Sequence, residues 1–122
     1  MEYQAIAKYI RMSPRKVRLV AHAVKRLTPP MALLRLRELS KRAGEPIADV
    51  VASVIANVKD KKADITKMRF KSIEVSHGPA MKRIRAVSRG QAHAYKKRMT
   101  HIRVILTDEA RSTKSEIRNK SK

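Results

Sequence analysis

The 122-residue sequence contains no cysteine, which excludes disulfides and thiolate metal sites. Aromatic residues make up 3% of the chain, too few for base stacking on single strands or for aromatic anchoring in a membrane. No apolar run approaches the roughly 20 residues of a membrane-spanning helix. The three glycines are too scattered to form a phosphate-binding loop. The first residues lack the features of a signal peptide, so we expect a cytoplasmic protein without a membrane partner.

Acidic residues are also scarce. Asp and Glu number 10 against 30 Lys and Arg, which gives a net charge of +20. No acid occurs from residue 3 to 37 or from residue 75 to 107. Such a chain repels itself when alone, and nucleic acid is the first partner to consider, with an acidic membrane surface second. The second acid-free stretch, residues 75–107, carries these cations: Lys82, Arg83, Arg85, Arg89, Lys96, Lys97, Arg98 and Arg103.

Three helices are predicted in the first half of the chain. Ser13-Pro14 and Thr28-Pro29 each combine a capping hydroxyl with a proline suited to the first turn. We therefore expect one helix over residues 14–25 and another that continues to a left-handed cap at Gly44. Pro46 opens the third helix, in which one apolar stripe recurs at helical spacing. The stripe consists of Ile47, Val50, Val51, Val54, Ile55 and Val58.

Alternating side chains predict strands over residues 3–10, 68–76 and 102–106. In the first strand, one face holds Tyr3, Ala5, Ala7 and Tyr9. The second strand changes its apolar face near Ser72, where we expect a β-bulge, and the third is suited to pair with it. The acid-free segment between the last two strands has a turn candidate, Ser88-Arg89-Gly90, at its middle, which predicts a long antiparallel hairpin over 77–101.

These elements define an α+β fold class: three helices packed on a small antiparallel sheet, with a long protruding β-hairpin. The hydrophobic fraction of 43% is enough for one modest core, so we expect a single domain over residues 1–110. Residues 111–122 form a basic polar tail that we expect to be disordered when free.

The start of the first helix carries the cations Arg11, Arg15, Lys16 and Arg18, although the helix dipole there disfavours positive charge. A bound phosphate would resolve this conflict. The alternative is a solvated basic face that costs a few tenths of a kcal/mol. The hairpin has three interpretations: a nucleic-acid reader, a membrane insertion loop or a disordered basic linker. Its composition favours recognition of the shape and phosphates of folded RNA or duplex DNA.

An RNase-like activity would need His77, His93 or His101 as general acid and base. No acid occurs in the stretch, and its single aromatic residue, Tyr95, is not expected to orient them. Histidines without cysteine or clustered carboxylates make a poor zinc site. We therefore expect no enzyme, no catalytic residue, no metal and no cofactor. An RNA-modifying factor and a nucleoid-type DNA binder remain alternatives to RNA scaffolding.

Two stretches resemble the bacterial ribosomal large-subunit protein twenty-two family. The first is residues 11–20, RMSPRKVRLV; the second combines 78–84, GPAMKRI, with 97–102, KRMTHI. The resemblance extends over residues 3–107. With the cations beside them, the signatures give the expected rRNA-binding set: Arg11, Ser13, Arg15, Lys16, Arg18, Gly78, Pro79, Lys82, Arg83, Arg85, Lys96, Lys97, Arg98 and His101.

The resemblance implies a non-catalytic constituent of the large subunit of a bacterial-type cytoplasmic ribosome. Such a protein binds large-subunit rRNA early in assembly and lines the nascent-peptide exit tunnel with its hairpin, beside ribosomal protein four. Its partners are rRNA, neighbouring ribosomal proteins and the nascent peptide, and no homo-oligomer is expected. The tip departs from the family pattern because its cation precedes the turn glycine. The expected tunnel-facing tip is Ala86, Val87, Ser88, Arg89, Gly90 and Gln91.

Overall fold

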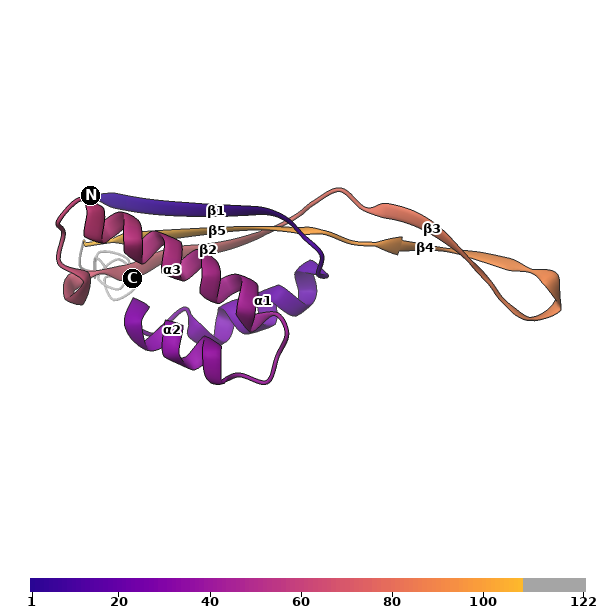
Figure 1. Cartoon of the computed structure of the whole chain (residues 1–122), viewed down its shortest axis with the longest axis horizontal. Coiled ribbons are helices and arrows are strands. Elements are labelled where there is room, and N and C mark those ends of the chain that lie inside the picture. The colour runs from indigo at the N-terminus through magenta and orange to yellow at the C-terminus, as the bar shows by residue number, and fades with distance from the viewer. Residues whose placement is uncertain (109–122) are drawn as a thin grey trace, which may run out of the picture.

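The computed structural model describes residues 1–108, a helix-and-sheet body with a hairpin extending from one end (Figure 1). One antiparallel sheet has the strand order β1-β5-β2, and β3 and β4 form a separate two-stranded ribbon. The predicted α+β fold class with a protruding hairpin is confirmed. The predicted tail, residues 111–122, lies outside the described residues. In order, the elements are β1 (Glu2–Ile10), α1 (Pro14–Val24), α2 (Pro29–Glu38), α3 (Gly44–Asp60), β2 (Arg69–His77), β3 (Met81–Ala86), β4 (Ala92–Lys97) and β5 (Thr100–Thr107).

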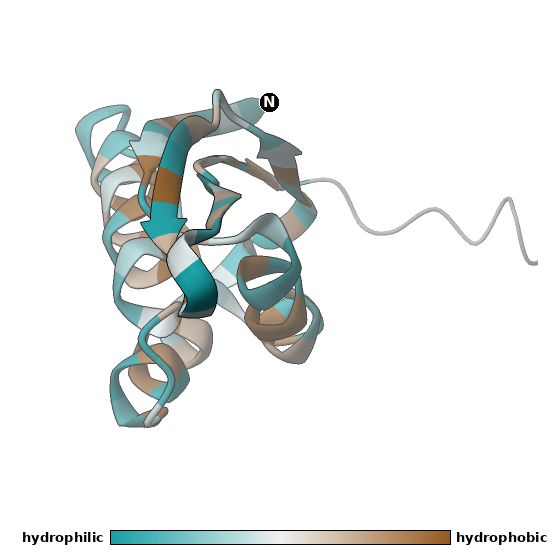
Figure 2. Ribbon diagram, turned by 90° about the vertical axis from the view of Figure 1, so that its right-hand side faces the viewer, coloured by the Kyte–Doolittle hydropathy of each residue, from teal (hydrophilic) through white to brown (hydrophobic). Residues whose placement is uncertain are grey.

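The central strand β5 pairs with β2, as the sequence predicts, and also with β1 on its other side. Ile102, Val104 and Leu106 are completely buried against the helices, whereas Arg103 is exposed on the opposite face. Hydrophobic and hydrophilic segments alternate along the ribbon of the body (Figure 2). On the outer face Arg103 donates to Oε1 of Gln4 at 2.9 Å and forms an ion pair with Glu74 at 3.4 Å.

Two irregularities bend the sheet. The register of β2 shifts between Phe70 and Ser72, which confirms the bulge predicted near Ser72. A second shift lies in β1 between Ala7 and Ile10, where Tyr9 has a φ of 60°. The prediction that Tyr9 shares a face with Tyr3 is therefore wrong: Tyr9 is 62% exposed, and Ile10 packs on the core in its place.

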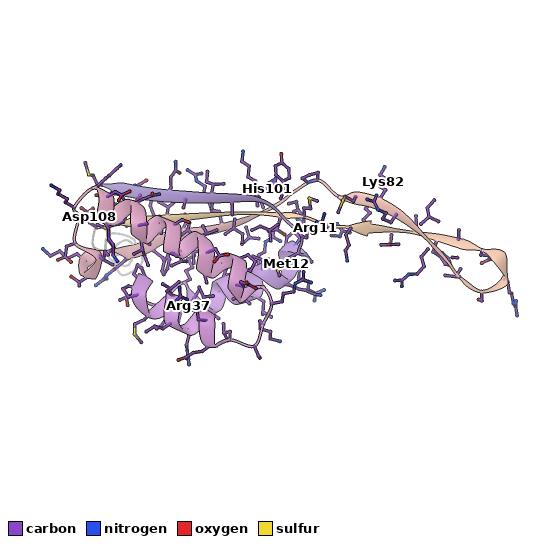
Figure 3. All side chains as sticks on the ribbon, viewed as in Figure 1. Arg11, Met12, Arg37, Lys82, His101 and Asp108 are labelled. Carbon is purple, nitrogen blue, oxygen red and sulfur yellow. The ribbon has the colours of Figure 1, made fainter. Side chains whose placement is uncertain are left out.

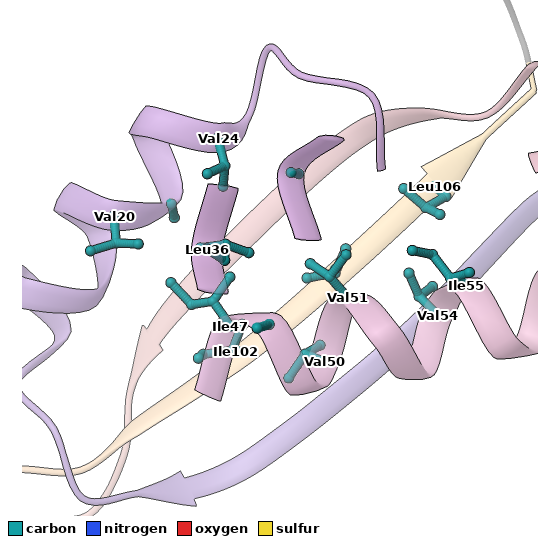
Figure 4. Packing of buried hydrophobic residues seen from close by; sticks show 14 of the residues in the cluster. Val20, Val24, Leu36, Ile47, Val50, Val51, Val54, Ile55, Ile102 and Leu106 are labelled. Atoms are coloured by element: carbon teal, nitrogen blue, oxygen red, sulfur yellow. The ribbon is translucent and has the colours of Figure 1, made fainter. Parts of the chain in front are cut away.

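The helix α3 supplies the largest part of the core. All six residues of its predicted stripe are buried, including Val51, Val54 and Val58 without measurable exposure. They meet Leu36 of α2 and the inner face of β5 (Figure 4). Each buried aliphatic side chain contributes about 1.5–3 kcal/mol relative to exposure, so this stripe holds the helical layer on the sheet.

The boundary between α2 and α3 differs from the prediction. The helix α2 ends at Glu38, because Leu39 has the extended backbone angle ψ of 131°, and Gly44 begins α3 two residues before Pro46. Gly44 does not have a positive φ, so it is not a left-handed cap. A Cβ atom on Gly44 would lie 2.9 Å from the carbonyl oxygen of Leu36. Glycine is needed there because the start of α3 lies directly against the backbone of α2.

The helices of the described segment are all too short or too polar to cross a membrane. This matches the lack of a long apolar run in the sequence.

Candidate nucleic-acid interface

The N-terminal end of α1 is the first candidate surface. Pro14 is buried at the first helical position, and Val17, Val20 and Val24 turn one side of the helix toward the core. The helical period therefore directs Arg15 and Lys16 away from the core, and both are exposed. Arg11 is exposed just before the helix.

No side chain caps this end of α1. Ser13 has the extended backbone of an N-cap residue, but its hydroxyl makes no capping hydrogen bond, so the predicted role of that side chain is wrong. Within residues 1–108, no protein group accepts a hydrogen bond from the amide N–H of Arg15 or Lys16. Unsatisfied amides, the positive end of the helix dipole and exposed cations coincide here, an arrangement suited to a phosphate.

The cations of the first signature differ in what they contact. Arg11, Arg15 and Lys16 have no ion pair with any residue of the described range. Arg18 instead donates from its guanidinium group to the backbone carbonyl of Val75 at 3.2 Å. Arg18 thus ties α1 to the outer edge of β2, a structural contact that the sequence pattern did not reveal.

The hairpin is the second candidate surface. Its strands pair in regular antiparallel register from Met81–Lys97 to Ala86–Ala92, which confirms the predicted hairpin, and its tip lies well beyond the body (Figure 1). The turn is at Ser88–Gly90, as predicted. Arg89 and Gly90 both have positive φ, 63° and 66°, and the amide of Val87 donates to the carbonyl of Gln91 at 2.9 Å.

The two faces of the ribbon carry different side chains, because strand neighbours alternate in direction. From the register, the cationic face of the hairpin consists of Met81, Arg83, Arg85, His93, Tyr95 and Lys97. The opposite face has two cations near the body and small or apolar residues toward the tip. This mixed face consists of Lys82, Ile84, Ala86, Ala92, Ala94 and Lys96. The side chains project from the ribbon on both sides (Figure 3).

Little within the ribbon offsets its charge. Lys82 lies directly opposite Lys96, a like-charge pair that is destabilising in a sheet. The Arg85 guanidinium lies 5.6 Å from the centre of the Tyr95 ring, which gives a modest cation–π contact. No acid occurs between residues 75 and 107, so the hairpin itself supplies no carboxylate to neutralise these cations.

The joint between body and hairpin brings the two surfaces together. The buried Thr100 side chain donates to the carbonyl of Met12 at 2.6 Å, and the amide of Gly78 donates to the carbonyl of Met99 at 2.9 Å. As a result, the segment that leads into α1 lies at the base of the hairpin, with Arg11 beside it and Lys82 farther out (Figure 3). Local sequence patterns could not have placed these segments side by side.

Gly78 and His101, both in the expected rRNA-binding set, have structural contacts at this joint. A Cβ atom on Gly78 would lie 3.2 Å from Met99 and from the His101 ring, so a side chain there would require these neighbours to shift by a few tenths of an ångström. Nδ1 of His101 accepts a hydrogen bond from the amide of Tyr9 at 3.1 Å. The two rings meet edge to face with centroids 5.1 Å apart. Pro79 and Arg98 lie in the same joint, with Arg98 exposed.

No catalytic or metal-binding constellation is found in residues 1–108. No group of three His, Asp or Glu side chains is placed to hold a metal ion there. Two hollows on the body, of about 200 and 500 Å3, contain no histidine among their lining residues.

Two carboxyl groups have a lowered pKa, and both lie on the body rather than on the basic surfaces. Hydrogen bonds from Thr66 lower the pKa of Asp64, and the bond from the Met1 amino group lowers the pKa of Asp108. The Met1 ammonium lies 2.9 Å from Asp108, which ties the outer end of β1 to the end of β5. These charges stabilise the fold locally and take no part in the candidate interface.

The fold and the surface charge together define an α+β body with a projecting basic hairpin that contains no acidic residue. The chain is similar to the family described as Ribosomal protein L22p/L17e, whose model matches residues 5–107. It belongs to this family. Membership confirms the resemblance seen in the two signatures and the prediction that the protein is not an enzyme.

Several bacterial proteins are similar over most of their length, each named "Large ribosomal subunit protein uL22". The one from Mesoplasma florum is 40% identical over 110 residues, covering 89% of this chain and 98% of the relative. The one from Syntrophus aciditrophicus is 42% identical over 110 residues, covering 89% and 100%. The one from Desulfotalea psychrophila is 38% identical over 109 residues, covering 88% and 99%.

Proposed function

We propose that this chain binds large-subunit rRNA through the start of α1 and through its hairpin, assists assembly of the subunit, and lines the nascent-peptide exit tunnel. As a member of its family it is a structural component of the large ribosomal subunit of bacterial-type, cytoplasmic ribosomes. The observation that carries the proposal is the projecting ribbon of residues 81–97, which has cations on both faces and no acid.

The ribbon is a poor structure for a free protein. An isolated two-stranded hairpin is marginal in water, and this one adds a lysine pair at directly opposed positions. Folded rRNA would remove the repulsion, because phosphates neutralise the cations and release counterions. The hairpin then becomes ordered as it is buried, and the energy of ordering is supplied by RNA contacts.

The arrangement of the two surfaces supports binding to one continuous RNA site. The start of α1 and the base of the hairpin lie at the same end of the body, joined through Thr100 and Met12. A phosphate at the amides of Arg15 and Lys16 would therefore lie beside RNA that follows the hairpin. Backbone contacts of this kind position a protein on folded RNA without reading base sequence.

The tip is proposed to face the tunnel lumen, beside ribosomal protein four and the nascent peptide. The support is its position at the far end of the ribbon, where residues 86–91 are nearly all exposed. Arg89 supplies the cation at this tip, in a left-handed conformation before Gly90. A change of Arg89 should alter tunnel behaviour and leave assembly intact.

Charge reversal at the start of α1 tests the rRNA proposal. The double substitution Arg15→Glu and Lys16→Glu should weaken binding to a large-subunit rRNA fragment by about 2–4 kcal/mol, because two phosphate contacts become repulsive. Filter binding measures the affinity, and far-ultraviolet circular dichroism checks that helicity is kept. Reversal of Arg35 and Arg37, exposed on α2, is the matched control and should change affinity much less. Equal losses in both variants would contradict a defined site at α1.

Sedimentation of assembled subunits tests the threaded hairpin. A tagged chain should remain with the large subunit after a high-salt wash, because a hairpin surrounded by RNA cannot leave by simple dissociation. A variant in which residues 82–96 are replaced by a short glycine turn should be washed off under the same conditions. A tag that migrates with DNA or at the top of the gradient would contradict the proposal.

A further inference from the structure

A groove between α3 and β1 is separate from both basic surfaces. It has a volume of about 200 Å3, and the residues that line it include Ala5, Ile6 and Ala7 of β1 and Pro46, Asp49 and Ser53 of α3. The volume is below the roughly 300–1,000 Å3 of a typical small-ligand pocket. The groove is therefore of a size to receive one or two side chains of a partner rather than a cofactor or metabolite.

The groove runs along the edge of the sheet formed by β1, where backbone groups have no strand partner over a short distance. β1 is an edge strand, and the side chain of Asn57 on α3 donates to the outward carbonyl of Gln4 at 3.2 Å. Backbone groups of an antiparallel strand alternate in direction, so the N–H and C=O of Ile6 also point outward. The irregularity between Ala7 and Ile10 ends the regular edge. Among the residues described, Asn57 is the only side chain that donates to this edge.

The charge beside the groove is negative, unlike that of the chain as a whole. Among the described residues that line the groove, Asp49 is the only charged one. The helix α3 carries Glu45, Asp49 and Asp60 against one cation, Lys59. Asp49 has no ion pair in the part of the chain that the structure describes. A phosphate placed here would be repelled by the carboxylate, whereas a lysine or arginine would be attracted.

We infer that this groove docks a short extended segment of a basic protein neighbour. The segment adds to the sheet at the backbone of Ile6, places an apolar side chain between Ala7 and Val50, and pairs a lysine or arginine with Asp49. Strand addition of this kind takes its affinity from backbone hydrogen bonds and its specificity from the pockets for side chains. The surface is independent of the rRNA contacts and lies on a helix that they do not use.

Site-directed photo-crosslinking in assembled large subunits tests the inference. The probe is p-benzoylphenylalanine in place of Ser53, which is exposed and lines the groove. After irradiation and RNase digestion, we expect a protein adduct that maps by mass spectrometry to a segment containing Lys or Arg. Asp49→Lys should lower the adduct yield about tenfold, because an ion pair becomes a repulsion, and Asp49→Glu should preserve it.

Two matched controls make the result specific to the groove. Asp60→Lys changes the charge equally on the same helix but outside the groove lining, and should leave the yield unchanged. The same probe at Ala56, exposed on α3 and outside the groove lining, should not give the adduct. Four outcomes would overturn the inference. They are the absence of an adduct, an adduct that is lost on RNase digestion, an adduct to a second copy of the chain, and an adduct yield that does not change with Asp49→Lys. The rRNA proposal would survive any of these outcomes.

Discussion

Single residues at the joint decide how the hairpin leaves the body. Tyr9 adopts a positive φ of 60°, which costs a non-glycine residue about 1 kcal/mol or more. Its amide bonds to Nδ1 of His101 and its ring meets the histidine ring edge to face, so these contacts offset the strain. The acceptor role assigns the ring proton of neutral His101 to Nε2. His101 is thus a structural residue, whether or not it also contacts rRNA.

The substitution His101→Phe separates these two roles. Phenylalanine keeps an aromatic ring beside Tyr9 but removes the acceptor, so the free energy of unfolding should fall by about 1–2 kcal/mol. Urea unfolding of the free protein, followed by circular dichroism, measures the change. His93→Phe on the exposed hairpin is the control and should have no such effect. Unchanged stability together with weaker rRNA binding would mean that His101 acts only as an RNA ligand.

Among the elements, the hairpin carries like charges whose repulsion destabilises its own folded structure. The Lys82–Lys96 pair repels across the ribbon in the free protein, yet both lysines are suited to phosphate contacts. Substitutions of these lysines should therefore change the stability of the free hairpin and its affinity for RNA in opposite directions. The body differs, because two of its ion pairs, Arg103–Glu74 and Lys71–Glu2, join strands of the same sheet.

The substitution Lys82→Glu tests this opposition. A Glu–Lys pair across the strands should stabilise the free hairpin by about 0.2–1 kcal/mol, seen as slower amide hydrogen exchange over residues 81–97. The same change should weaken rRNA binding, because it places a carboxylate next to phosphates. Lys82→Ala removes the repulsion without adding an acid, and should weaken binding less. If Lys82→Glu left rRNA affinity unchanged, this part of the mixed face would not contact the RNA backbone.

At the scale of the whole molecule, the start of α1 and the hairpin carry cations in segments without acidic residues, while α3 carries most of its charge as acid. We therefore propose that the basic surfaces bind rRNA and that the side formed by α3 and β1 binds a protein. Roughly 6–10 phosphate contacts are expected of the basic surfaces, so rRNA affinity should fall by about three to five decades between 50 and 200 mM salt.

This dependence is measured by filter binding over a series of salt concentrations. The Arg15→Glu and Lys16→Glu variant should lower the slope of log affinity against log salt by about 1–2, because two phosphate contacts are lost. A nearly flat dependence of the unaltered chain would contradict electrostatic scaffolding.

The elements themselves were predictable because their signals are local. The α3 stripe, the alternation in β5, the bulge near Ser72 and the turn at Ser88–Gly90 each depend on neighbours within a few residues, and the structure confirms them. The rRNA-contact residues remain predictions, although the charge pattern and the two signatures name them directly. The predicted end of α2 was wrong because Gly44 is required by its close contact with the Leu36 backbone, and not by a left-handed turn at the end of the helix.

Composition and local periodicity were sufficient for the α+β class and the basic hairpin, since charge and side-chain alternation are properties of short segments. The two signature stretches were sufficient for the family. Long-range packing alone placed β5 between β1 and β2, turned Tyr9 outward, and joined the start of α1 to the base of the hairpin. It also left the open edge of β1 beside Asp49. These features depend on pairing between residues far apart in the chain, such as Met12 with Thr100 and Tyr9 with His101. No local pattern specifies such partners.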